Sequence, residues 1–548
     1  MTVTRQLMCI TLALTGLLSL PCWAQAPNTS ASPDTGCAAL ASVDFSGIQD
    51  APTQIVDAKL TEASDGQPAY CQIQGYIWPQ VGFEVRLPIS HWNGKFFELG
   101  CGGRCGTFAW MMWCPLQRGY ACIASDMGHS GKNQDMLWAY NNLQALIDFD
   151  TRGAHVAALA GKAITEHYYS KAPDKAYFIG CSNGGLQALV EAQRFPWDFN
   201  GIISLDGVPN LSDIDMEQVW GARTLRGEDG HALLTHQELQ LVHNAALASC
   251  DMDDGVKDGV ISDPYQCKFD PSELICKSGV KTACLSEAQV DAVKKIYAGP
   301  TTRKGEKLSY IRGPTPGSEL GWIDDNVGMD YIHSGSGLGG SEEWVLEAFR
   351  YADFTPAPGP HWKLTDFDFD RDYTRLGVSE TLWDASNPDL RKFKGAGGKL
   401  IVAQGWNDQS VVPAVNIGYY QLAEKTMGGR AATQEFFRLF VVPGMEHCTG
   451  GAGAFAIDYV SYLEKWVENG QAPDKLVGAH VDEQYLLQHS VIDGQQYGAW
   501  IGALQLKFPL DPAIPVTFTR PIYPYPVLAK YRGTGDPSRA ENFHAVGP

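Results

Sequence analysis

Residues 176–205 constrain the fold more than any other part of the sequence. Residues 176–179 are apolar and predict a strand, residues 185–194 predict a helix, and the apolar residues 201–205 predict a second strand. Connections this short place the two strands parallel in one sheet, with the helix packed across it. The sequence therefore predicts an α/β fold.

The same alternation occurs on both sides of a long interruption. The predicted elements are a helix over residues 150–169 before the interruption and, after it, a strand over 399–404, a helix over 414–427, a strand over 436–442 and a helix over 452–469. The intervening stretch is rich in Gly, Asp, Pro and Trp and lacks this pattern. We therefore expect an α/β domain built from residues 37–206 and 395–548, interrupted by a lid domain over residues 207–394.

The first 26 residues have the layout of a secretory signal. Arg5 precedes an apolar run over residues 7–20, and a short exit segment with small residues follows. The run is too short to cross a bilayer, and Pro21 before Cys22 disfavours the alternative of a lipoprotein. We expect removal of residues 1–26 and a secreted or periplasmic protein with no membrane partner.

The net negative charge argues against a nucleic-acid partner. The chain carries a formal net charge of −20 at pH 7, which repels nucleic acid and anionic membrane surfaces. Hydrophobic residues make up 44% of the chain and charged residues only 19%, a composition that forms a core instead of remaining disordered. We expect a globular enzyme or binding protein with no nucleic-acid partner.

The cysteine count agrees with export. Of 14 cysteines, Cys9 and Cys22 lie in the predicted signal. The twelve that remain form an even number in a chain that we expect to be exported, which favours disulfide bonds. A zinc site is the weaker interpretation, because no CxxC pair or Cys/His cluster has the spacing of zinc ligands.

A candidate nucleophile lies between the first predicted strand and its helix. Gly180-Cys181-Ser182-Asn183-Gly184 matches the pattern G-x-S-x-G, in which small flanking residues allow a sharp turn that raises the serine hydroxyl above the sheet. A glycine-rich turn without chemistry is the alternative, but the flanking strand and helix favour a nucleophile. Such a serine needs partners in the order Ser, Asp or Glu, His.

Asp408 and His447 meet this requirement. Each lies just past a predicted strand, and α/β sheets place their sites at the carboxyl ends of parallel strands. His129 is the nearest rival, but it precedes the serine and a packing role in a loop fits it better. The sequence therefore predicts a catalytic triad of Ser182, Asp408 and His447.

Two cysteines border the predicted nucleophile and base. Cys181 precedes Ser182, and Cys448 follows His447. When the serine and the histidine are within hydrogen-bond reach, their chain neighbours come within the Cα separation of a disulfide, roughly 4.4–6.8 Å. We predict a Cys181–Cys448 disulfide that holds the base against the nucleophile. A buried free thiol or a different partner is the alternative.

Together these motifs resemble the tannase and feruloyl esterase family, over nearly the whole mature chain. The Cys-Ser pair, the strand-end Asp and the His-Cys pair carry the resemblance. Other matching segments are Gly100-Cys101-Gly102-Gly103, Ser125-Asp126-Met127-Gly128-His129, Pro524-Tyr525-Pro526 and Gly533-Thr534-Gly535-Asp536. The resemblance implies an α/β-hydrolase fold and a secreted serine carboxylesterase that hydrolyses esters of aromatic, phenolic acids through an acyl-enzyme. Hydrolysis of terephthalate monoesters, as by the family's mono(2-hydroxyethyl) terephthalate hydrolase, is the alternative.

Ester hydrolysis also needs backbone donors for the oxyanion of the tetrahedral intermediate. The N–H of Asn183, directly after the nucleophile, is one candidate, and the N–H of Gly102 or Gly103 is the other. A tight strand exit is the alternative role for this glycine turn.

Four aspartates lie within residues 251–258. They repel one another unless a hard cation or solvent compensates, and Ca²⁺ prefers carboxylate and carbonyl oxygens; an acidic solvated turn is the alternative. The segment is not an EF-hand loop, because Ser262 stands where the last ligand, a Glu, is required. The family resemblance implies a structural Ca²⁺ site in the lid, held by the side chains of Asp251, Asp254 and Asp258 and the carbonyls of Val256 and Val260.

Further disulfides are expected around this site and near the N-terminus. The expected pairs are Cys250–Cys267, Cys276–Cys284 and Cys37–Cys71. Short closed loops around a metal would stiffen an insertion that we expect to be poor in core residues. The partners of four cysteines stay open: Cys101, Cys105, Cys114 and Cys122.

Substrate specificity is expected to reside in the insertion. Its aromatic side chains offer flat surfaces for a substrate ring, or else form its core: Trp322, Trp344, Phe349, Tyr351 and Trp362. Arg350 or Arg312 is a candidate partner for a substrate carboxylate, and we select Trp344 and Arg350 as substrate contacts. Two other classes of function stay open, an amide or peptide hydrolase on the same scaffold and a calcium-dependent binding protein without catalysis.

Overall fold

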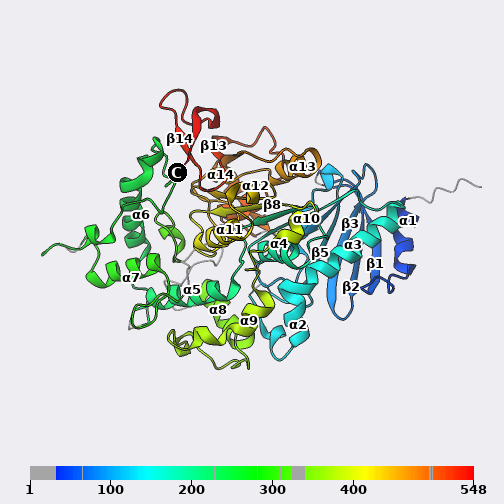
Figure 1. The fold of residues 1–548 in the computed structure, drawn as a ribbon, viewed down its shortest axis with the longest axis horizontal. Coiled ribbons are helices and arrows are strands. Elements are labelled where there is room, and N and C mark those ends of the chain that lie inside the picture. Colours follow the sequence, from blue (N-terminus) through cyan, green and yellow to red (C-terminus); the bar gives the residue numbers. More distant parts are fainter. Residues whose placement is uncertain are drawn as a thin grey trace, which may run out of the picture.

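A nine-stranded sheet lies at the centre of the computed structural model, within the described part of the chain (Figure 1). The structure describes residues 33–547, apart from positions 65, 133, 228–229, 280–281, 309–311, 324–339, 493–494 and 497. The predicted signal, residues 1–26, lies outside the described residues. In chain order the strands are β1 (Thr53–Thr61), β2 (Tyr70–Ile77), β3 (Val81–Pro88), β4 (Lys95–Leu99), β5 (Ala121–Ser125), β6 (Lys175–Cys181), β7 (Gly201–Leu205), β8 (Lys399–Gly405) and β9 (Phe437–Val442).

The sheet combines an antiparallel edge with a parallel half. Its strand order is β1-β2-β3-β5-β4-β6-β7-β8-β9. The first four of these pair antiparallel in succession, and from β5 to β9 every pair is parallel. The parallel strands are apolar runs because both their faces are buried; every residue of β7, for example, is buried. The strands that precede the predicted triad residues, β6, β8 and β9, all lie in this parallel half.

Helices cover both faces of the sheet. The helices α3 (Gly153–Tyr169), α4 (Asn183–Arg194) and α11 (Ala414–Thr426) share one apolar cluster with the strands. The helix α13 (Tyr459–Asn469) packs into a second cluster that contains the alternate strand residues. The chain therefore has the mixed α/β fold that the sequence predicts.

Two predicted helices begin later than expected. The helix α3 begins at Gly153, because Asp150 has a φ of 53° and the chain bends there. The helix α13 begins at Tyr459, seven residues after position 452, because Asp458 caps it by accepting a hydrogen bond from a backbone N–H of the first turn.

Residues 207–394 contribute no strand to the sheet in the part of the chain that the structure describes. Their helices lie to one side of it, green to yellow-green in Figure 1: α5 (Leu211–Thr224), α6 (His236–Cys250), α7 (Glu287–Ala298), α8 (Gly340–Tyr351) and α9 (Gly377–Trp383). The expectation of a core-poor insertion is wrong. The segment has its own apolar cluster, in which Trp322 and Phe349 are fully buried.

The remaining helices and strands complete the chain. They are α1 (Pro33–Ala39), α2 (Leu143–Ile147), α10 (Arg391–Gly395), α12 (Arg430–Gln434), β10 (Leu476–Val481), α14 (Glu483–Gln488), β11 (Val491–Ile492), β12 (Gln495–Gln496), α15 (Ala499–Leu504), β13 (Val516–Ile522), β14 (Leu528–Tyr531) and β15 (Phe543–Val546). Within the described ranges no helix has both the length and the hydrophobicity needed to cross a membrane.

Six disulfides join the twelve cysteines of the described chain. The pairs are Cys37–Cys71, Cys101–Cys105, Cys114–Cys122, Cys181–Cys448, Cys250–Cys267 and Cys276–Cys284. Two of these pairs use the four cysteines whose partners the sequence left open. Each bond closes a loop that the unfolded chain would otherwise leave open, so the set reduces the entropy of the unfolded state.

Candidate active site

Ser182 lies in the sharp turn between β6 and α4. Its backbone has a φ of 60° and a ψ of −124°, a left-handed conformation that costs energy for a residue with a side chain. Glycine at position 180 permits the turn, since a Cβ there would lie 2.2 Å from the carbonyl oxygen of Gly184. The side chain of Ser182 does not cap α4, so the hydroxyl is not used to hold the helix.

Asp408 and His447 form a hydrogen-bonded pair. His447 Nδ1 lies 2.8 Å from Asp408 Oδ2, and both side chains are buried. The other oxygen of Asp408 accepts the backbone N–H groups of Ser410 and Val411 at 2.9 and 2.8 Å. These donors fix the carboxylate, which in turn fixes the imidazole with its proton on Nδ1. His447 Nε2 is therefore left as an acceptor, and it is buried without a hydrogen-bond partner among the described residues.

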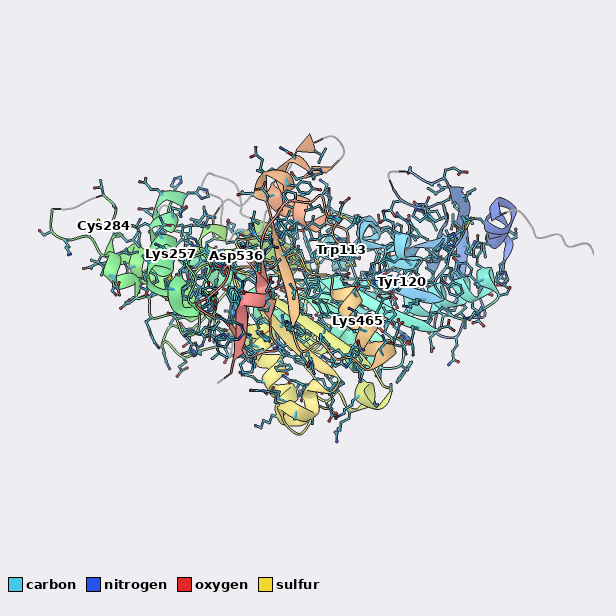
Figure 2. The ribbon with its side chains drawn as sticks, turned by 90° about the horizontal axis from the view of Figure 1, so that it is seen from above. Trp113, Tyr120, Lys257, Cys284, Lys465 and Asp536 are labelled. Carbon is cyan, nitrogen blue, oxygen red and sulfur yellow. A yellow bond between two sulfur atoms is a disulfide. The ribbon has the colours of Figure 1, made fainter. Side chains whose placement is uncertain are left out.

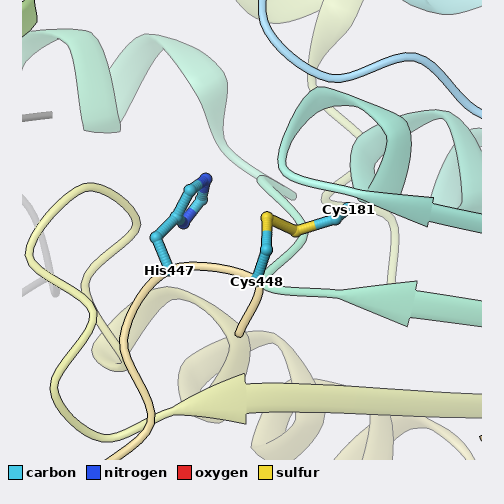
Figure 3. A group of neighbouring side chains, drawn as sticks. All are labelled: Cys181, His447 and Cys448. Atoms are coloured by element: carbon cyan, nitrogen blue, oxygen red, sulfur yellow. A yellow bond between two sulfur atoms is a disulfide. The ribbon is translucent and has the colours of Figure 1, made fainter. Parts of the chain in front are cut away.

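The Cys181–Cys448 disulfide brings the nucleophile turn and the histidine loop together. The two Cα atoms are 5.8 Å apart, and a ring nitrogen of His447 lies within 4.8 Å of both sulfur atoms. Figure 3 shows the disulfide joining the turn after β6 to the loop after β9, with the His447 ring beside it. The three atoms do not form a metal site, because sulfurs bonded to each other are not thiolate ligands. Ser182, Asp408 and His447 thus share one end of the parallel strands.

The glycine turn after β4 packs against the start of α4. The side-chain amide of Asn183 donates a hydrogen bond of 2.5 Å to the carbonyl oxygen of Gly103. Gly103 has a φ of 62°, and a Cβ on Gly102 would lie 2.4 Å from the ring of Trp110. The turn therefore requires both glycines, and it lies beside the first residue of the helix that follows the nucleophile.

Arg104 connects this glycine turn to residues 207–394. The sequence did not reveal this contact. It is fully buried, its guanidinium lies 3.7 Å from the ring centroid of Trp344, and Nη2 is 3.6 Å from Asp215 Oδ2. The indole of Trp344 donates to the same aspartate at 3.1 Å. One face of Trp344, a predicted substrate contact, is thus occupied by Arg104. No sequence pattern signals this contact, because the three residues belong to separate segments.

The other predicted substrate contacts have partners within the insertion. Arg350 pairs with Glu347 at 3.2 Å and donates to the carbonyl oxygen of Trp362 at 3.0 Å. Three of the five aromatic residues are buried in the apolar cluster of residues 207–394, the alternative role stated for them: Trp322, Phe349 and Trp362. Tyr351 is buried in the cluster of the central sheet. Arg312 lies over the ring of Tyr265. Of the five aromatic residues considered as substrate contacts, Trp344 alone is half-buried, and the other four are buried.

The aspartate segment after α6 contains buried carboxylate oxygens, the kind of donor that a hard cation prefers. Asp254 Oδ2 accepts a hydrogen bond from Ser262 at 2.8 Å, and Asp258 Oδ2 pairs with Arg520 at 2.5 Å. The second oxygen of Asp258 is buried and has no hydrogen-bond partner in the described chain. Burial raises the pKa of both carboxyl groups. A bound cation would offset that cost. Among the described residues, the oxygens of Asp251, Asp254 and Asp258 do not come together as three ligand atoms within 4.8 Å of one another.

Among the predicted cation ligands, the side chain of Asp251 has both of its oxygens engaged by the backbone. Both oxygens of Asp251 accept backbone N–H groups, from Asp258 at 3.0 Å and from Gly259 at 3.1 Å. Asp254, Asp258 and Val260 line one small cavity of about 40 Å³. A separate group of possible metal ligands, His155, Glu191 and Asp198, lies between α3 and α4.

Comparison with known proteins shows that the chain is similar to esterases in sequence and in structure. The sequence model of the family described as "Tannase and feruloyl esterase" matches residues 67–546. An uncharacterized esterase of Xanthomonas campestris pv. campestris is 30% identical over 94% of this chain and 92% of its own length. The mono(2-hydroxyethyl) terephthalate hydrolase of Piscinibacter sakaiensis is 29% identical over 90% of this chain and 87% of its own. The crystal structure of feruloyl esterase B from Aspergillus oryzae superposes with a TM-score of 0.76 at 25% identity, over 94% of this chain and 100% of that one.

Proposed function

Because the chain belongs to the tannase and feruloyl esterase family, we propose that it is an exported serine carboxylesterase acting on esters of aromatic acids. The observation that carries the proposal is the buried Asp408–His447 pair, whose second ring nitrogen is free to accept a proton beside the Ser182 turn. The names of the relatives support the ester bond as the target. The feruloyl esterase and the terephthalate monoester hydrolase support an aromatic acyl group.

In the proposed reaction an acyl group passes from an alcohol to Ser182 and then to water. His447 Nε2 takes the Ser182 proton as Oγ bonds to the ester carbonyl carbon, and the same proton then moves to the departing alkoxide as the C–O bond breaks. Water next loses a proton to His447 and attacks the acyl-enzyme, which releases the acid and returns the proton to Ser182. Asp408 holds the ring and stabilises the imidazolium throughout.

Backbone donors are proposed to stabilise the oxyanion of each tetrahedral intermediate. The N–H of Asn183 opens α4, where the unpaired N–H groups and the helix dipole favour negative charge. The N–H of Gly102 or Gly103 is the proposed second donor. Support comes from the hydrogen bond between Asn183 and Gly103, which keeps the two segments adjacent.

Residues 207–394 are proposed to form a lid domain between two parts of an α/β-hydrolase domain, residues 37–206 and 395–548. Their separate apolar cluster supports this division. Trp344 and Arg350 are the proposed substrate contacts on the lid. The stacking of Trp344 on Arg104 supports a position for Trp344 near the glycine turn.

A structural Ca²⁺ ion is proposed for the lid. The side chains of Asp251, Asp254 and Asp258 and the carbonyls of Val256 and Val260 would hold it, and the ion would neutralise a cluster that is otherwise repulsive. Export to an oxidising compartment is proposed from the predicted signal, and the six disulfides support it.

The test is hydrolysis of a matched ester panel by the mature protein and by Ser182→Ala. The panel contains methyl gallate, methyl ferulate, methyl 4-hydroxybenzoate, mono(2-hydroxyethyl) terephthalate, an aliphatic ester and the amide analogue of the best ester. We expect turnover of at least one aromatic ester that the variant abolishes. Preference for the terephthalate monoester would favour the alternative acyl group. Preference for the amide would favour an amide hydrolase. No turnover of any substrate with Ca²⁺ present would contradict the proposal.

A further inference from the structure

Asp206 is a fully buried carboxylic acid at the end of β7, next to the proposed triad. Its Oδ1 accepts the backbone N–H of Gly405 at 2.7 Å, and its Oδ2 accepts the backbone N–H of Cys448 at 2.9 Å. Gly405 ends β8 and begins the loop that carries Asp408, whereas Cys448 directly follows His447. One carboxyl group therefore bridges the loops that present the acid and the base.

The backbone of Asp206 has a positive φ, which is uncommon for a residue other than glycine. Its φ is 41°, within the left-handed region that costs energy for a residue with a Cβ. Its own N–H donates to the carbonyl oxygen of Ala403 in β8 at 2.8 Å. The neighbouring strand thus fixes the residue from the main chain, and the bent backbone directs the side chain toward the two triad loops.

Two buried carboxyl groups face each other at this point. Burial raises the pKa of Asp206 well above its ordinary value, and the charge of Asp408 and a side-chain hydrogen bond to it raise it further. Two adjacent buried carboxylates cannot both be ionised at low cost. Asp408 accepts two backbone N–H groups and the N–H of the imidazole, one donor more than the two backbone N–H groups that Asp206 accepts.

We propose that Asp206 is a positioning residue of the triad, a buried carboxyl group that bridges the Asp408 loop and the His447 loop through the backbone N–H groups of Gly405 and Cys448. Because burial raises its pKa, Asp206 keeps its proton and adds no charge beside the imidazole. It acts through Asp408 and His447 and does not touch the substrate. This inference rests on the proposed function, because it assigns a role within that triad.

The remaining titratable groups around Asp206 agree with a neutral acid. Tyr459, at the start of α13, faces it, and its hydroxyl is buried with no hydrogen-bond partner among the described residues. Burial, with a contribution from Asp206, raises the pKa of Tyr459, so the phenol stays neutral. Asp408 is the other acid whose charge acts on Asp206, and His447 bonds to the Oδ2 atom of that second carboxyl group.

The test uses a fluorophosphonate probe, so it does not depend on knowing the substrate. Ser182 Oγ bonds to phosphorus, fluoride leaves, and His447 takes the serine proton; the second-order rate constant therefore reports triad geometry, and its pH dependence reports the base. The variants are Asp206→Ala, which removes the bridge, and Asp206→Asn, which keeps a donor toward Asp408 and one acceptor. Asp198→Asn, a buried carboxyl group at the far end of α4, is the matched control.

We expect Asp206→Ala to label about 10²-fold more slowly at a temperature where it is folded, because small displacements of catalytic groups have effects of this size. Asp206→Asn keeps one of the two acceptors, so it is expected to label faster than Asp206→Ala but more slowly than the parent chain, with the acidic limb of its pH profile unmoved. The control is expected to lose stability without losing rate. A merely structural role would lower only the melting temperature of Asp206→Ala.

Several results would overturn the inference. One is a labelling rate for folded Asp206→Ala within about threefold of the parent chain. Another is a fall of about one unit in the acidic-limb pKa of Asp206→Asn, which would mean that a carboxylate charge had been removed; this measurement decides the question if Asp206→Ala does not fold. Failure of the parent chain to label at all, with Ser182→Ala as reference, would refute the proposed function instead.

Discussion

Removal of the Cys181–Cys448 disulfide should reduce both stability and activity, to extents that follow from its place in the chain. The bond closes a loop with a sequence separation of 267 residues. In the chain-entropy description, a loop of this length stabilises the folded state by about 5–6 kcal/mol. Cys276–Cys284, with a separation of 8, is the matched comparison, and the same relation gives about 2.5 kcal/mol.

The two disulfides also differ in their relation to the proposed triad. Cys448 is the residue that follows His447 in the chain. Cys284 lies at the outer end of the insertion, remote from the central strands (Figure 2). Without the Cys181–Cys448 bond the base is no longer tethered to the nucleophile turn. We expect Cys181→Ala with Cys448→Ala to lower the rate of ester hydrolysis about 10²-fold, and Cys276→Ala with Cys284→Ala to leave it within about twofold.

Guanidinium unfolding followed by tryptophan fluorescence measures the first effect, and initial rates on the best ester measure the second. Both double variants are purified under the conditions used for the parent chain, and thiol titration checks that the other disulfides have formed. Equal losses of unfolding free energy in the two variants would refute the loop-length reasoning. An unchanged rate in the Cys181→Ala, Cys448→Ala protein would refute the tethering of the base.

Three further predictions concern the triad, the cation site and the effect of pH. Asp408→Asn should lower kcat about 10⁴-fold, because the wrong imidazole tautomer is favoured; steady-state rates check this, and a loss below tenfold would contradict it. Chelation by EDTA should lower the melting temperature, corresponding to about 2–3 kcal/mol at saturating Ca²⁺, and added Ca²⁺ should restore it in the parent chain but not in Asp258→Asn; an unchanged melting curve would count against the site. Burial raises the pKa of Asp150 to about 8, so the folded state keeps a proton that the unfolded state releases near pH 4. Stability should therefore fall as pH rises from about 4 to about 8, and Asp150→Asn should flatten that slope in melting curves; an identical slope would contradict this assignment.

Local pattern was sufficient to predict the strands β6 to β9 of the parallel half of the sheet. Apolar runs of strand length, separated by helical spacing, predicted β6, α4, β7 and β8 close to their observed bounds. The carboxyl-end rule then selected Asp408 and His447, because both lie just past such strands. The helix starts were less predictable, since the kink at Asp150 depends on a left-handed backbone that no residue type announces.

The residues that the sequence did not reveal act across long distances in the chain. Asp206 bonds to backbone groups 199 and 242 residues away, and Arg104 meets Trp344 from a different segment. Asp206 does follow a predicted strand, so the carboxyl-end rule alone could have selected it beside Asp408. What the rule could not supply is its partners, because these are backbone N–H groups that every residue possesses.

The most direct test of the central claim is rapid-quench mass spectrometry of the mature protein during turnover of its best aromatic ester. The account predicts a transient mass increase equal to the acyl group, located by peptide mapping on Ser182 and absent in Ser182→Ala. Product formation with the acyl group on a different residue, or turnover undiminished in Ser182→Ala, would contradict it.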